Sequence, residues 1–384
     1  MNRRDFLALA SALPVALLAP RLSAEPLGGG GRVLVLVQLA GGNDGLNTVI
    51  PFADPAYRAA RPSLAVGRDQ ALHLTERVGL HPGLDPLMKP WKDGRLAVVQ
   101  GVGYDAPNRS HFRSIEIWET ASDSEEVLAS GWLDTVLARA KGEPPTAVVL
   151  GNEDTGPTEG AGLRTLVMSS PQEFIASARR MPTGSRATAN PALAHILRVQ
   201  DDIRLSAEAM ARALKDAPAL GLDFPAGPLG RQLEVAASLL VAGLPLAVIK
   251  VVHNGYDTHA GQRGPHDRLM GELGQALATF QACMTRHGRW NDVLMMTYSE
   301  FGRRVAENGS GGTDHGTAAP HLVLGGRVKG GLYGAQPSLT ATSAGDLVHT
   351  VDFRQLYATV SDRWWSRPTA FSGERFKPLG FLTA

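Results

Sequence analysis

Short apolar stretches recur along the chain, separated by segments with helical periodicity. The first, 32–39, is a continuous run rich in β-branched residues, which is typical of a strand buried on both faces of a parallel sheet. Similar runs predict strands at 96–102, 146–150, 246–252, 293–298 and 321–324. The patterns between them predict helices at 110–121, 191–214, 229–242, 268–286 and 352–365. This alternation predicts an α/β fold with a mainly parallel sheet and helices on both faces.

The alternation continues along most of the chain, with no internal repeat and no clear linker. We therefore expect residues 25–384 to form a single domain. The segment 151–188 is polar and turn-rich, and we expect it to be an excursion that covers one edge of the sheet. The single cysteine, Cys283, excludes an intramolecular disulfide and any cysteine-based zinc cluster.

The first residues have the order of an export signal. Paired arginines at 3–4 precede the mildly apolar run 8–18, and small residues stand before Glu25. This order predicts a twin-arginine signal at 1–24, so the twin-arginine translocase is an expected partner and the protein is expected to be periplasmic or secreted. The run is too short to serve as a stable membrane anchor. The alternative is an amphipathic N-terminal helix with two chance arginines.

The overall charge is close to neutral. The chain has 38 Lys and Arg residues against 37 Asp and Glu residues, a formal net charge of +1. This balance offers no electrostatic reason to expect nucleic acid or an anionic membrane surface as the main partner.

Polar side chains gather next to the apolar runs. Asp44 follows the first run, Arg109, Ser110 and His111 follow the second, His253, Asp257 and His259 follow the run at 246–252, Glu300 follows the run at 293–298, and Asp314 and His315 precede the last run. In open parallel sheets, ligands bind beyond the carboxyl ends of the strands. We therefore expect these side chains to converge on one crevice.

The types of side chain in this group favour a metal ion. Asp257 and His259 alternate in an extended stretch, which places both side chains on the same side and within reach of one ion. Carboxylates mixed with imidazoles, without thiolates, suit Zn²⁺, Mn²⁺, Fe or Ca²⁺. The alternative for this stretch alone is a hydrogen-bonded surface loop, and the nearby Glu300, Asp314 and His315 favour the metal site.

Two of the candidate residues have a structural alternative. Asp44 lies in a glycine-rich loop, where an aspartate commonly satisfies backbone donors of a turn. Ser110 precedes a helical stretch, where serine commonly caps the helix. The same position at a helix N-terminus has a positive potential that stabilises an oxyanion, and Arg109 beside it could bind a phosphate or sulfate. The two interpretations of Ser110 are compatible.

Four motifs carry a resemblance to a known family. They are Leu-Ala-Gly-Gly-Asn-Asp-Gly-Leu-Asn-Thr at 39–48, Asn-Arg-Ser-His-Phe at 108–112, Tyr-Ser-Glu-Phe-Gly-Arg at 298–303 and Thr-Asp-His-Gly-Thr at 313–317. Together with the twin-arginine leader, they resemble the domain-of-unknown-function 1501 family. That family is grouped with the alkaline-phosphatase-like superfamily of phosphatases, sulfatases and phosphodiesterases, so the resemblance implies an alkaline-phosphatase-like fold.

The resemblance also implies roles for individual residues. Asp44 resembles the first metal-binding carboxylate, Ser110 the nucleophile, Asp257 with His259 the ligands of one metal site, Glu300 the aspartate of a second site, and His315 the final histidine. Two departures stand out. Only Thr258 separates Asp257 from His259, where three residues are usual, and Phe301 stands where the second site has a histidine. His111 or Asp314 could take that histidine's place, and the chain could hold one ion or none.

These residues predict an exported metal-dependent hydrolase of phosphate or sulfate esters, with a small anionic ester or a polysaccharide as substrate. The predicted catalytic residues are Ser110, Arg109 and His111, and the predicted metal ligands are Asp44, Asp257, His259, Glu300, Asp314 and His315. The ion would polarise the ester oxygen and Arg109 would neutralise the anion. The alternative, motivated by Phe301, is a non-catalytic periplasmic binding or assembly protein that keeps the fold and recognises an anionic polysaccharide or another anionic ligand.

Overall fold

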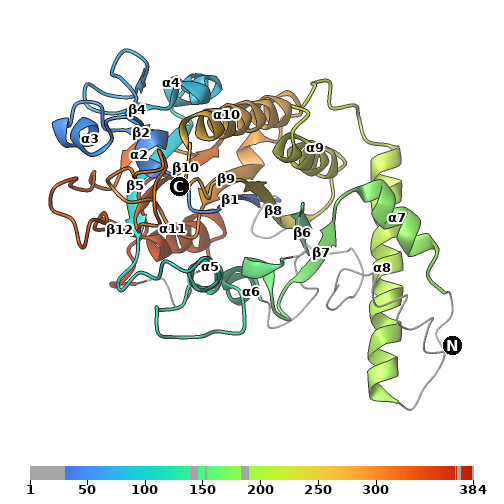
Figure 1. The fold of residues 1–384 in the computed structure, drawn as a ribbon. Helices are drawn as coiled ribbons and strands as arrows, with labels where there is room; N and C mark the ends of the chain where they lie inside the picture. The colour runs from blue at the N-terminus through green and yellow to red at the C-terminus, as the bar shows by residue number, and fades with distance from the viewer. Residues whose placement is uncertain are drawn as a thin grey trace.

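A computed structural model describes residues 31–138, 146–151, 154–182, 190–367, 369 and 373–382. The predicted export signal at 1–24 lies outside these residues. The described chain folds around a central sheet with helices on both faces (Figure 1). Within the described part, no helix is both long and apolar enough to cross a membrane.

Nine strands of the described residues form the central sheet. Their order is β11 (Gly331–Tyr333), β5 (Leu96–Gly103), β10 (Ala319–Gly325), β9 (Val293–Tyr298), β1 (Val33–Ala40), β8 (Leu246–Asn254), β6 (Thr146–Leu150) and β7 (Arg164–Met168), and β12 (Val351–Asp352) pairs with β5. Most neighbouring strands are parallel, whereas β10 runs antiparallel to both β5 and β9. The six predicted strands are all present, and the predicted fold class is confirmed.

Strand β1 shows why its sequence is continuously apolar. Successive side chains of a strand point to opposite faces of the sheet. Val33, Val35, Val37 and Leu39 pack on one face in a core shared with α9 (Pro228–Val241) and α10 (Arg263–Arg286). Leu34 and Leu36 pack on the other face with α5 (His111–Thr120), α6 (Trp132–Leu137) and α11 (Phe353–Thr359). Both faces are therefore covered by helices (Figure 1).

Several smaller strands and helices lie outside the central sheet. Strands β2 (Val49–Ile50), β4 (Gly79–Leu80) and β3 (Leu72–His73) form a second, three-stranded sheet. The helical segments around it are α2 (Gly45–Thr48), α3 (Pro55–Ala60), η1 (Pro82–Leu87) and α4 (Met88–Lys92), and further single turns are η2 (Gly156–Thr158) and η3 (Trp290–Asp292). Helix α2 begins directly after Asp44, so this group of small elements starts at the glycine-rich loop that follows β1.

The segment predicted as an edge excursion contains regular structure. Strand β7 pairs in parallel with β6 and is itself the edge strand, and α7 (Pro171–Arg179) follows it. Helix α8 (Pro191–Lys215) lies beyond that edge (Figure 1). The polar residues Arg164 and Thr165 are buried in β7, which is why the composition of this segment did not indicate a strand.

The last predicted helix is divided in two. It forms α11 and then one π-helical turn, η4 (Val360–Trp364). Trp364 and Trp365 are both buried in the core that also contains Leu34 and Leu36 of β1.

The strand directions bring the candidate residues to one edge. Because β1, β8 and β9 are parallel and β10 runs antiparallel to β9 and to β5, the carboxyl ends of β1, β5, β8 and β9 lie at the edge where β10 begins. The loops at this edge carry the predicted site residues.

Candidate metal centre

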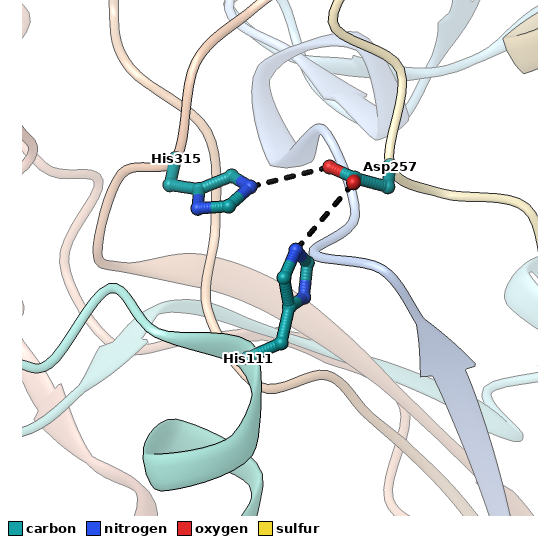
Figure 2. Close-up of side chains that lie close together, drawn as sticks. All are labelled: His111, Asp257 and His315. Atoms are coloured by element: carbon teal, nitrogen blue, oxygen red, sulfur yellow. Dashed lines mark hydrogen bonds and ion pairs between the residues drawn. The ribbon is translucent and has the colours of Figure 1, made fainter.

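Asp257 lies at the centre of a group of imidazoles at this edge. Figure 2 shows His111 and His315 each turning a ring nitrogen toward its carboxylate. His111 Nε2 lies 3.5 Å from Asp257 Oδ2, and His315 Nε2 lies 3.2 Å from Asp257 Oδ1. The three side chains come from the first turn of α5, the loop after β8 and the loop before β10. One ligand atom from each lies within 4.8 Å of the other two, so the three could bind one ion.

His259 approaches the same carboxylate. Its Nε2 lies 3.0 Å from Asp257 Oδ1 and 2.9 Å from His315 Nε2. Three imidazoles therefore surround one carboxylate. The structure thus brings together His259, His315 and Asp257, which were expected as ligands, and His111, which was expected as a catalytic residue or as the replacement of a missing histidine.

The other nitrogen of each ring faces an oxygen acceptor. His111 Nδ1 lies 2.9 Å from Glu300 Oε1, and His315 Nδ1 lies 2.9 Å from the carbonyl oxygen of Arg109. His259 Nδ1 lies 3.4 Å from Asp314 Oδ1. An acceptor oxygen requires the proton on Nδ1, so each neutral ring presents an Nε2 lone pair.

These lone pairs point at one another and at the carboxylate of Asp257. Such an arrangement of acceptors is repulsive unless a cation or a proton lies among them. Metal-binding histidines typically donate their other N–H to a carboxylate or a backbone carbonyl, which is the arrangement seen here. Burial lowers the pKa of His315, which favours the neutral ring that a metal ligand requires.

Glu300 contacts the group through His111. Its side chain is buried, and its Oε1 accepts hydrogen bonds from His111 Nδ1 at 2.9 Å and from the backbone N–H of Gly41 at 2.8 Å. The Ser299 hydroxyl donates to Oε2 at 3.3 Å. Glu300 therefore contacts the Nδ1 side of the His111 ring, whereas Asp257 contacts its Nε2 side.

Arg303 is a buried cation that sequence reasoning did not assign to the site. Its Nη2 donates to Asp257 Oδ1 at 2.7 Å, and its side chain is fully enclosed. The same Nη2 also contacts the carbonyls of Gly41 and Tyr256, while Nε donates to Gly42 and Nη1 to Thr313. Although partial burial alone would raise the pKa of Asp257, the hydrogen bond and charge of Arg303 lower it to about 2. Asp257 is therefore ionised at neutral pH.

Asp44 lies in a separate ion pair. Its Oδ2 is 2.5 Å from Arg61 Nη1, and neither side chain is exposed. Gln262 also donates to this oxygen, and Arg61 donates to the carbonyls of Arg304 and Val305. Burial alone would raise the pKa of Asp44, but the charge of Arg61 lowers it. The carboxylate is therefore neutralised by a residue whose role the sequence did not indicate.

Ser110 and Arg109 lie at the rim of the group. Ser110 is exposed and is the N-cap residue of α5, and its hydroxyl makes no capping hydrogen bond. Arg109 is 43% exposed, and its Nη1 lies 3.1 Å from Asp346 Oδ2. Ser110 directly precedes His111 in the chain and therefore lies at the N-terminal, positive end of α5.

Phe301 packs beneath the imidazoles. Its ring centroid lies 4.9 Å from that of His111 and 4.6 Å from that of His315, and the side chain is buried. A Cβ on Gly42 would lie 2.4 Å from this ring, and Gly42 has φ +78°, so only glycine fits opposite Phe301. The phenylalanine that stands in place of an expected histidine therefore forms an apolar floor for the group.

His253 does not join the imidazoles. Its Nδ1 lies 2.9 Å from the Tyr256 hydroxyl and its Nε2 3.2 Å from Glu272 Oε2. Asp314 is exposed and, besides His259, accepts a hydrogen bond from Asn308 at 3.0 Å. Of the two, only Asp314 reaches the imidazole group.

The fold and the site together define an α/β protein with a candidate metal centre at the carboxyl edge of its sheet. The chain belongs to the family described as "Protein of unknown function (DUF1501)", whose model matches residues 97–367. The family expected from the sequence is thereby confirmed. No curated protein matches the chain significantly.

Several solved structures are similar to the chain. One is Ps i-CgsB in complex with k-i-k-neocarrahexaose, at 10% identity and a TM-score of 0.42, covering 88% of this chain and 73% of that one. Another is the PsFucS1 sulfatase from Pseudoalteromonas sp., at 10% identity and a TM-score of 0.40, covering 92% and 71%. A protein in the alkaline phosphatase superfamily from Vibrio parahaemolyticus matches at 12% identity and a TM-score of 0.33, covering 88% and 72%.

Proposed function

We propose that the protein is an exported metal-dependent hydrolase of phosphate or sulfate esters, whose ion lies among His111, Asp257 and His315. One observation carries the proposal: three imidazoles hold an acceptor oxygen at Nδ1 and turn Nε2 toward one ionised carboxylate. Unless a ring is protonated, these acceptor groups face one another at short range, and the Arg303 guanidinium reaches only Asp257 Oδ1 and His259 Nε2. A bound ion would satisfy the remaining lone pairs.

The spacing of these atoms suits a four-coordinate ion. Bonds of about 2.0–2.1 Å in a tetrahedron separate neighbouring ligand atoms by about 3.3–3.4 Å. The separations are of this size, although each histidine faces its own oxygen of the carboxylate: His111 Nε2 lies 3.5 Å from Asp257 Oδ2, and His315 Nε2 lies 3.2 Å from Oδ1. A donor set rich in imidazole favours Zn²⁺, Fe or Mn²⁺ over Ca²⁺, which prefers oxygen ligands.

The chain's own residues supply the remaining parts of a hydrolytic site. A bound ion would act as a Lewis acid on the ester oxygen and lower the pKa of a nearby hydroxyl or water. Ser110 is the candidate nucleophile, because its uncommitted hydroxyl stands at the positive end of α5 beside His111. Arg109, which is partly exposed next to it, would bind the anionic group of the ester.

Metal analysis and an ester panel test this function. Protein purified without chelator is expected to contain a divalent metal and to hydrolyse an aryl phosphate or an aryl sulfate. Ser110→Ala is expected to abolish turnover and keep the metal, because the hydroxyl makes no structural hydrogen bond. Protein with neither metal nor turnover would contradict the proposal. Metal without turnover on any ester would favour the binding protein, for which the apolar floor at Phe301 is the supporting observation.

We also propose that residues 1–24 direct export and that the mature chain from residue 25 is one periplasmic or secreted domain. The paired arginines at 3–4 are the support for this part of the proposal. Changing both to lysine is expected to retain the precursor inside the cell. Export that is unchanged by Arg3→Lys with Arg4→Lys would contradict the twin-arginine route.

A further inference from the structure

We propose that this centre binds a single divalent ion, and that two buried guanidiniums, those of Arg61 and Arg303, provide fixed positive charge next to the other potential ligands. The inference rests on the proposed metal binding and specifies its stoichiometry and its ligands. In particular, it excludes Asp44 from the ligands, although the sequence resemblance assigned it to the metal.

All four candidate carboxylates accept hydrogen bonds from donors of the chain, Asp257 from Arg303, but they differ in whether they also face the Nε2 atoms. Asp44 is paired with Arg61 at 2.5 Å. Glu300 accepts from Gly41 and from His111 Nδ1, and Asp314 accepts from Asn308 Nδ2. Only Asp257 faces the Nε2 atoms directly. One carboxylate and three imidazoles supply at most the four ligands of one tetrahedral ion, and any three of them would leave that ion an open position. The set is too small for two ions.

The ion pair between Asp44 and Arg61 is held in place by burial and by further hydrogen bonds. Both side chains are completely buried, and the other guanidinium nitrogens of Arg61 donate to Val305 at 2.9 Å and to Arg304 at 2.8 Å. Turning Asp44 toward an ion would leave a buried guanidinium without its counter-charge, which is strongly unfavourable. Asp44 Oδ1 is buried without a hydrogen-bond partner. An ion there would need further ligands, yet the only group of three such residues found in the described chain is His111, Asp257 and His315.

Arg303 occupies the side of the centre next to His259. Its Nη2 lies 2.7 Å from Asp257 Oδ1, and its Nη1 lies 3.5 Å from His259 Nε2. These are the atoms that a second ion would have to share with the first. The guanidinium cannot move aside easily, since its three nitrogens together contact four backbone carbonyls. His111, His315 and the Oδ2 atom of Asp257 are left for one ion on the opposite side.

A matched pair of substitutions tests this inference. Wild type, Asp44→Asn and Asp257→Asn are each loaded with Zn²⁺ or Mn²⁺ and desalted, and metal per folded chain is measured by mass spectrometry. The same chemical change is made at two carboxylates that each contact a buried arginine. We expect one ion in wild type, one in Asp44→Asn, and at least 10-fold lower affinity in Asp257→Asn. Two ions in wild type, or loss of the ion from folded Asp44→Asn, would overturn the inference.

A second measurement covers the case in which Asp44→Asn does not fold. X-ray absorption of the wild-type protein loaded with Zn²⁺ is expected to show nitrogen and oxygen neighbours, imidazole scattering, and no second metal. A metal–metal distance of about 3.5–4 Å, as found in two-metal sites, would overturn the inference and leave the proposed function intact. Protein that binds no metal at all would instead contradict the proposed function itself.

Discussion

Two carboxylates at the same edge of the sheet each contact a buried arginine, yet their surroundings differ. Asp44 and Arg61 are both 0% exposed, whereas Asp257 is 48% exposed above an Arg303 that is 0% exposed. The first carboxylate is closed off by its partner. In Asp257, Arg303 contacts only Oδ1, and the other oxygen, Oδ2, is the one that His111 approaches. A carboxylate paired with an arginine can therefore be a structural ion pair in one loop. In another loop, the carboxylate of such a pair can be a candidate metal ligand whose negative charge the arginine balances.

The second difference lies in the neighbours of each pair. Asp44 receives donors, from Arg61 and Gln262. Asp257 receives one donor, Arg303, and otherwise faces imidazole nitrogens that offer lone pairs. Donors satisfy a carboxylate, whereas converging lone pairs require a cation. The comparison therefore predicts that loss of Asp44 affects folding and that loss of Asp257 affects metal binding.

The largest expected effect is on stability. Asp44→Asn leaves the charge of Arg61 buried and unpaired, so the free energy of unfolding should fall by about 3–5 kcal/mol. Asp257→Asn should lower it by less: it also removes the carboxylate partner of the buried Arg303, but the Asp257 side chain is half exposed and its ion pair is therefore partly screened by solvent. Denaturant unfolding of the two metal-free variants measures both values. Equal losses in the two variants would remove the distinction between the pairs.

The next largest expected effect is on metal affinity and concerns His315, a proposed metal ligand. His315→Ala should weaken metal affinity by more than about 100-fold, because loss of a direct ligand costs more than loss of a residue behind it. His253→Gln is the control, since that histidine contacts Tyr256 and Glu272. A competition titration with a chelating dye reports both affinities. If His315→Ala keeps wild-type affinity and only its melting temperature falls, His315 is a hydrogen-bonding residue of its loop.

A smaller effect is expected for the carboxylates behind the rings. Glu300→Gln should weaken metal affinity by about 10–100-fold, because Glu300 orients His111 and supports its basicity. Asp314→Asn should lie at the lower end of that range, since its contact with His259 is longer, at 3.4 Å, and Asp314 is 54% exposed. The same titration compares them. A Glu300→Gln protein that loses all metal would show that Glu300 is itself a ligand.

The smallest effect appears at low pH. The pKa of Asp257 is about 2 in the folded protein, below its ordinary value of about 3.9. Its contribution to stability is therefore present above about pH 4 and is lost as the pH falls from about 4 to 2. Because the side chain is half exposed, we expect about 1 kcal/mol or less. Unfolding of metal-free wild type and Asp257→Asn across this range should show a shallower dependence in the variant, and parallel curves would contradict it.

The framework of the fold could be predicted from the sequence because its central strands are apolar on both faces. Strands β1 and β9 were predicted nearly to their ends. Strand β7 was missed because Arg164 and Thr165 begin a strand that is nevertheless buried. The π-helical turn after α11 was also missed, since an apolar pattern does not distinguish it from a regular helix.

The candidate site could be predicted only in part. Strand ends pointed to Asp257, His259 and His315, because polar residues after buried strands gather at one edge. Arg61 and Arg303 carried no such signal, since an arginine in a loop is most often exposed and its burial depends on carbonyls from distant loops. The sequence therefore indicated which residues could meet, and the packing decided which of them are neutralised.

A crystal of the mature protein grown with Zn²⁺ would test the central claim most directly, by anomalous scattering at the zinc edge. We predict one peak per chain, within about 2.0–2.2 Å of His111 Nε2, His315 Nε2 and an Asp257 oxygen. A peak at Asp44 with Arg61 displaced, or crystals with no peak among the imidazoles, would contradict the account.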